Sequence, residues 1–201
     1  MFSVFERGIV VFPEGMSMST ALFICFFSSF LFPYLLGSVN SAIVVSTALL
    51  KADIRRTGSK NAGLTNMYRV YGGKAALLVL LGDSLKMVLS LLFVGFLFGM
   101  QYAPYGFSCN SFLYVAGVAC ILGHIFPVYY GFKGGKGVLC SAVMVLMLSP
   151  YVFVAEFLIF LLVLWATKYV SLSSMTAGIM YPLVFNRVWA LFGGHPDGLM
   201  S

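Results

Sequence analysis

Long apolar runs separated by short polar stretches dominate this chain. The apolar spans cover residues 20–50, 75–99, 112–130, 138–149, 151–167 and 175–192, after an N-terminal extension at 1–16. A helix needs about 20 apolar residues to cross a bilayer, so 138–149 is either a short tilted span or a re-entrant segment. The pattern predicts an all-α polytopic membrane protein, a single membrane domain with about six transmembrane segments.

Composition supports this class and excludes others. Of the 201 residues, 61% are hydrophobic and 9% are charged, whereas soluble domains carry about 25% charged residues. The net charge of +6 is explained by basic loops that face an anionic leaflet, so no nucleic-acid partner is expected. The four cysteines show neither metal spacing nor a disulfide framework, and we expect no metal and no cofactor.

The basic residues concentrate in three polar stretches, at 51–74, 131–137 and 168–174. Lysine and arginine mark cytoplasmic loops in membrane proteins. All three stretches fall on one side if 138–149 counts as a span. The pattern therefore predicts cytoplasmic loops at these positions and an N-terminus outside.

The loop at 131–137 contains the run Lys133-Gly134-Gly135-Lys136-Gly137. Glycines allow backbone N–H groups to approach an anion, and lysines supply positive charge. A helix that starts directly after the loop adds its N-terminal dipole. The residues alone leave two readings equally open, a phosphate-binding loop and an ordinary basic connection between helices.

The stretch at 51–74 carries a series of small polar side chains and one arginine. Hydroxyls, amides and the planar guanidinium group hydrogen-bond phosphate oxygens well. A solvated basic loop explains Arg55 and Arg56, but it does not explain this series. We expect the series to converge with the glycine-rich loop on one anion site; its members are Ser59, Asn61, Thr65, Asn66 and Arg69.

Two polar features lie inside the apolar spans. Asp83 and Lys86 are three residues apart and share a helical face, which predicts an ion pair near the inner surface or a group that supports the site. The polar notch at 37–41 either lines a site or mediates helix–helix contact.

Two sequence blocks stand out together. The first runs from Gly58 to Asn66 and is followed by Arg69. The second joins Gly123-His124-Ile125-Phe126-Pro127 to Phe132-Lys133-Gly134-Gly135-Lys136-Gly137-Val138. Together they resemble the bacterial acyl-phosphate-dependent glycerol-3-phosphate acyltransferases. The resemblance extends from about Tyr34 to Ser174, and the second block is specific because both of its halves match.

The resemblance implies a seven-span bacterial inner-membrane enzyme whose site faces the cytoplasm. Such enzymes transfer an acyl chain from acyl phosphate to the 1-hydroxyl of glycerol 3-phosphate, giving lysophosphatidate and phosphate in phospholipid biosynthesis. The partners implied are these two substrates and membrane lipid; no oligomeric state is implied. The catalytic candidates are His124, Lys136, Arg69 and Ser59; the phosphate-binding candidates are Ser59, Asn61, Thr65, Asn66, Arg69, Lys133, Gly134, Gly135, Lys136 and Gly137.

The chain departs from the family pattern at its C-terminus. The last span and the third motif of the family have no counterpart here, so the chain is expected to be truncated before them. An inactive fragment of the enzyme is therefore the first alternative. A transporter of a small phosphorylated anion is the second, but a transporter places its polar groups near the bilayer midplane rather than in loops on one face.

Overall fold

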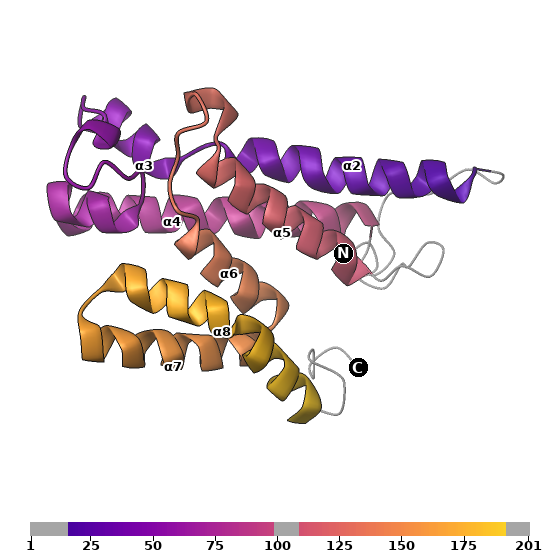
Figure 1. The fold of residues 1–201 in the computed structure, drawn as a ribbon. Helices are drawn as coiled ribbons and strands as arrows, with labels where there is room; N and C mark the ends of the chain where they lie inside the picture. The colour runs from indigo at the N-terminus through magenta and orange to yellow at the C-terminus, as the bar shows by residue number, and fades with distance from the viewer. Residues whose placement is uncertain (1–15, 99–108, 192–201) are drawn as a thin grey trace. The chain divides into compact units, whose positions relative to one another are not determined.

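The computed structural model describes residues 16–98 and 109–191, and every regular element within them is a helix (Figure 1). The expected extension at 1–16 lies almost wholly outside the described residues. The α-helices are α2 (Met18–Gly37), α3 (Ser41–Val44), α4 (Leu64–Phe98), α5 (Cys109–Ile125), α6 (Val138–Leu148), α7 (Pro150–Thr167) and α8 (Val170–Leu191). A π-helix, Val45–Leu49, and two 3-10 turns, Ile54–Arg56 and Val128–Tyr130, complete the list.

Four helical segments within the described residues are long and apolar enough to cross a membrane. They cover Met18–Leu49, Leu64–Phe98, Ser111–Tyr130 and Pro150–Thr167, and Val138–Leu148 is a shorter apolar helix. The predicted class, an all-α polytopic membrane protein, is confirmed. The spans assigned to 138–149 and 175–192 stay predictions.

Two of the polar stretches are more helical than the sequence indicated. Helix α4 begins at Leu64 rather than after residue 74, and its non-helical residue Gly72 (φ 78°, ψ −173°) separates a short first segment from the long apolar one. The first segment forms because Leu64 and Met67, three residues apart, both pack on the hydrophobic core. Similarly, the loop expected at 168–174 is confined to Lys168 and Tyr169, where Lys168 ends α7 in the left-handed conformation.

The first apolar span, 20–50, is not one continuous helix. Helix α2 ends at Gly37, and α3 starts after Asn40, whose side-chain oxygen accepts a hydrogen bond from the Ile43 amide at 3.1 Å. Asparagine is a favoured N-cap because its side chain satisfies a free amide of the first turn. The polar notch predicted at 37–41 is therefore a helix break.

The chain divides into two compact units, 1–141 and 142–201. The second unit contains α7 and α8, which pack against each other on either side of the turn at Lys168. The first unit contains α2, α4 and α5 in mutual contact, and it holds both sequence blocks singled out above.

Glycines let α2 and α5 approach closely. A Cβ on Gly37 would collide with the Cys120 carbonyl, and a Cβ on Gly123 would collide with the Tyr34 carbonyl. Small residues at such crossings allow backbones to touch, a common basis of helix association in membranes. The C-terminal ends of α2 and α5 thereby meet beside the middle of α4 (Figure 1).

A cluster of buried charges joins the same three helices. The Lys86 ammonium lies 2.9 Å from Asp83 Oδ1 and donates to the carbonyls of Gly37 and Val39, each at 3.0 Å. It also lies 2.9 Å from Nδ1 of His124 on α5. The side chains of Asp83 and Lys86 are only 2% and 4% exposed, so the pair is a buried salt bridge, as its spacing predicted.

We predict that Lys86→Met destabilises the protein by about 3–5 kcal/mol, because it leaves the Asp83 carboxylate buried without its partner. Thermal unfolding in detergent measures the loss. Lys74→Met, at an exposed lysine on the same helix, is the matched control and should have little effect. The double variant Asp83→Asn/Lys86→Met should recover much of the stability. Equal effects of Lys86→Met and Lys74→Met would contradict a stabilising role for the cluster.

Candidate functional site

Two loops at one end of the first unit carry the predicted site. The first loop follows the π-helix and covers residues 50–63, and it leads into the first segment of α4. The second loop covers residues 126–137 between α5 and α6. Helix α5 ends at Ile125 because Pro127 disfavours a helical conformation at the residue before it and has no amide hydrogen to donate.

Asn66 organises the first loop. Its side-chain oxygen accepts a hydrogen bond from the Ser59 amide at 2.9 Å, and its amide group donates to the carbonyls of Ile54, Thr57 and Asn61 at 3.3, 3.1 and 3.0 Å. The residue is 1% exposed. Asn66 was predicted to bind phosphate, but these four backbone partners occupy its polar atoms. Its position supports a structural role instead.

The glycines of the second loop also differ from the expectation. The amides of Gly134 and Gly135 donate to the carbonyls of Ile125 and His124, each at 3.1 Å. They satisfy carbonyls at the end of α5, which lack partners inside the helix. These two amides therefore point back into the protein rather than towards an anion. Because α6 begins at Val138, the N-terminal amides of that helix follow directly after Lys136 and Gly137.

The absence of a side chain at Gly135 brings the two loops together. A Cβ at this position would collide with Nε2 of His124 and with the carbonyl oxygen of Ala62 in the first loop. That carbonyl also accepts a hydrogen bond from the Asn40 side chain at 3.2 Å. The expected convergence of the two blocks is thus present in the backbone itself.

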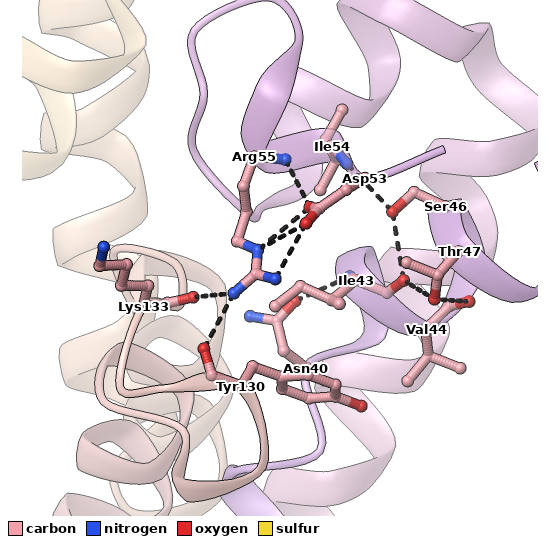
Figure 2. Close-up of polar contacts among 10 residues, drawn as sticks. All are labelled: Asn40, Ile43, Val44, Ser46, Thr47, Asp53, Ile54, Arg55, Tyr130 and Lys133. Carbon is pink, nitrogen blue, oxygen red and sulfur yellow. Dashed lines mark hydrogen bonds and ion pairs between the residues drawn. The ribbon is translucent and has the colours of Figure 1, made fainter. Parts of the chain in front are cut away.

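Arg55 provides a second connection between the loops (Figure 2). Its Nη1 donates to the carbonyl of Tyr130 at 2.9 Å and to that of Lys133 at 3.4 Å. Its Nε and Nη2 bind the Asp53 carboxylate at distances from 2.9 to 3.2 Å. The hydrogen bond from Arg55 lowers the pKa of Asp53 below its usual value, and the same bond raises the pKa of Arg55. Both groups are therefore charged at neutral pH.

His124 is buried beside the second loop, with 3% of its surface exposed. Its Nδ1 lies 2.9 Å from the Lys86 ammonium and 3.6 Å from Asp83 Oδ1. Its Nε2 faces Gly135. The ring is therefore enclosed by the protein at both nitrogens.

The remaining predicted residues differ in exposure. Gly137 is buried, and Asn61 and Gly134 are half-buried. Among the described residues, no hydrogen bond links Thr65 or Arg69 to the second loop. The exposed candidates are Ser59, Thr65, Arg69, Lys133 and Lys136.

Sequence reasoning missed Arg55, which had been interpreted as a solvated loop residue, and it gave Asn40 no specific role. The spacing Asp53-x-Arg55 was the available signal, because a carboxylate two residues before an arginine can pair with it. No comparable signal existed for Asn40, since its partner Ala62 is 22 residues away. The described residues contain no group of three or more potential metal ligands.

Comparison with known proteins places this site in a family. The family model described as glycerol-3-phosphate acyltransferase matches residues 27–196. The glycerol-3-phosphate acyltransferase of Mycoplasmopsis agalactiae is 41% identical over 167 residues, which cover 82% of this chain and 69% of the relative. The match to the enzyme of the same name from Ureaplasma urealyticum is 38% identical and covers 79% of this chain and 65% of that relative.

Similarity to a solved structure indicates the same family. The crystal structure of PlsY, an integral membrane glycerol 3-phosphate acyltransferase, in its glycerol 3-phosphate form has a TM-score of 0.67 and 35% identity. The match covers 90% of this chain and 81% of that one. The chain spans about two thirds of the length of the first two relatives and carries both loops of the site. It belongs to the glycerol-3-phosphate acyltransferase family.

Proposed function

We propose that this chain transfers a fatty acyl group from an acyl phosphate to the 1-hydroxyl of glycerol 3-phosphate. The hydroxyl oxygen attacks the acyl carbon, the bond from that carbon to the phosphate oxygen breaks, and the products are lysophosphatidate and inorganic phosphate. The observation that carries the proposal is the junction of the two loops at Ala62 and Gly135, which brings two polar, basic segments together. A site for two phosphorylated substrates needs this concentration of cations and donors.

The exposed side chains supply the binding groups. Arg69 suits a phosphate because its planar fork can donate two parallel hydrogen bonds, and Lys133 and Lys136 add compact positive charge. Ser59 adds a hydroxyl, and the N-terminus of α6 contributes its dipole. Acyl phosphate is already activated, so the protein acts mainly by positioning the substrates and stabilising charge.

The surroundings of His124 bear on the identity of the base. Its buried ring has Nδ1 beside Lys86 and Asp83 and Nε2 beside Gly135, so both nitrogens lie against the protein rather than towards a substrate. A phosphate oxygen of a substrate takes that proton in our proposal. His124 then acts as a positioning residue that supports Gly135.

The proposed setting is a bacterial inner membrane, with both loops on the cytoplasmic side and the N-terminus outside. The positive-inside rule supports this orientation, because Lys51, Arg55, Arg56, Lys133 and Lys136 all lie in these two loops. Glycerol 3-phosphate is water-soluble and the acyl donor is a lipid. A site at the ends of membrane helices is accessible to both.

Activity is tested with purified protein in detergent, palmitoyl phosphate and labelled glycerol 3-phosphate. We expect labelled lysophosphatidate from acyl phosphate and none from acyl-CoA. Lys136→Met and Ser59→Ala should each lower the rate by about a hundredfold or more, the size seen when one preorganised donor to a reacting group is removed. Lys74→Met is the control and should keep its rate. Absence of product from the unaltered chain would overturn the proposed function.

Variants of Asn66 and of its neighbour Thr65 distinguish a structural role from a substrate-binding role. Asn66→Leu should lower the unfolding free energy by roughly 2–4 kcal/mol, because buried backbone groups lose their partners. Thr65→Val, at an exposed position, should leave stability unchanged and raise the KM for a substrate. Detergent thermal unfolding and initial rates measure the two effects. Unchanged stability with a raised KM in Asn66→Leu would restore the phosphate-binding role.

A further inference from the structure

The second loop has an unfavourable backbone conformation that its own side chains do not explain. Gly131 and Phe132 are consecutive residues with positive φ, at 66° and 58°. A left-handed conformation is costly for a residue with a Cβ such as Phe132. The Phe132 side chain is 58% exposed, so burial of its ring does not hold the conformation. Such a conformation persists only where surrounding contacts determine it.

Contacts from the first loop lie on both sides of these two residues. The carbonyl of Tyr130 precedes them and the carbonyl of Lys133 follows them, and the guanidinium of Arg55 donates to both (Figure 2). Within the loop, the amides of Tyr130 and Phe132 donate to the Pro127 carbonyl at 3.1 and 3.0 Å. Arg55 therefore donates to the carbonyls on either side of the turn, which these hydrogen bonds within the loop do not use.

The arginine is itself held in place. Asp53 binds its Nε and Nη2 and also accepts from the Arg55 amide at 2.9 Å. Ile54, which lies between Asp53 and Arg55, is fully buried, and its amide donates to the Ser46 hydroxyl at 3.3 Å. These contacts fix the position of the guanidinium before any substrate binds, and they place it on a rigid base formed by the π-helix.

The same contacts argue against direct phosphate binding by Arg55. Its Nε and one hydrogen of Nη2 bind the Asp53 carboxylate, and its Nη1 donates to two carbonyls, so one of its five hydrogens is left for another acceptor. The charge of the guanidinium is neutralised by Asp53 at 2.9 Å. A phosphate held by two parallel hydrogen bonds would have to displace an anion that is already bound in the geometry that arginine prefers.

We propose that Arg55, oriented by Asp53, is a positioning residue of the acyl transfer. It fixes the backbone between Tyr130 and Lys133. The backbone in turn sets the direction from which Lys133 and Lys136 contact glycerol 3-phosphate. This role rests on the proposed function and assigns a residue to it that does not contact the substrate. The Asp53–Arg55 pair connects the two loops, so the first loop determines the backbone conformation of the second.

The test uses Arg55→Lys, Arg55→Met and Asp53→Asn, with Arg56→Lys and Arg56→Met as matched controls at the exposed neighbour. Arg55→Lys keeps the positive charge but loses the planar guanidinium group that binds several acceptors at once. We expect each Arg55 variant to raise the KM for glycerol 3-phosphate by about tenfold, the size of one charge-assisted hydrogen bond. The KM for acyl phosphate should change by less than about threefold, and the Arg56 controls should match the unaltered chain.

Asp53→Asn separates positioning from direct attraction. Removing this carboxylate frees the charge of Arg55, so a direct phosphate contact would become stronger and the KM for glycerol 3-phosphate would fall. Loss of positioning would raise that KM instead, and this is the result we expect. A lowered KM in Asp53→Asn, or an unchanged KM in all three variants, would overturn the proposal.

Hydrogen–deuterium exchange provides a readout that needs no activity. The amides of Gly134 and Gly135, which donate to carbonyls at the end of α5, should exchange about tenfold faster in Arg55→Met than in Arg56→Met. Unchanged exchange would contradict the positioning role. If the unaltered chain makes no lysophosphatidate but exchange increases as expected, the loop connection stands and the proposed function fails.

Discussion

The ammonium of Lys86 is the interaction on which the rest of the first unit depends. Helix α2 stops at Gly37, and the break leaves carbonyls of Gly37 and Val39 inside the protein without helical partners. Unsatisfied carbonyls are costly at membrane depth. Lys86 donates to both, and Asp83 balances its charge one turn away. The buried cation therefore stabilises the helix break and, with it, the cap at Asn40.

The same ammonium also positions His124. Lys86 lies 2.9 Å from Nδ1 of the ring, and Nε2 on the other side of the ring lies beside Gly135. A buried charge between three helices thus extends its influence to the second loop through one imidazole ring. Supporting contacts of this kind orient the groups around a site without touching a ligand, and they demand close geometry.

The sequence was sufficient for the class of fold and for identifying the two polar segments that lie in contact in the structure, because both depend on local patterns. Apolar run length indicates a membrane helix, and clustered polar residues between runs indicate a loop. Local patterns did not separate Asn66 from Thr65. An amide suits a backbone carbonyl and a phosphate oxygen equally well, and only the burial of Asn66 against Ile54 and Asn61 distinguishes the two. Arg55 was misread for a related reason, since the carbonyls it binds lie more than 70 residues away.

The glycines of the second loop show that a motif can be recognised from the sequence while the contacts of its backbone cannot. A glycine-rich run beside lysines suggests amides directed at an anion. Here Gly134 and Gly135 direct their amides at α5, and at Gly135 the missing Cβ allows contact with Ala62. The glycines thus act by permitting two loops to touch, and the exposed lysines on either side add positive charge. A loop built this way needs its shape maintained from outside, because glycine restricts the backbone least of all residues. Arg55 of the first loop supplies such contacts, because it donates to two carbonyls of the second loop.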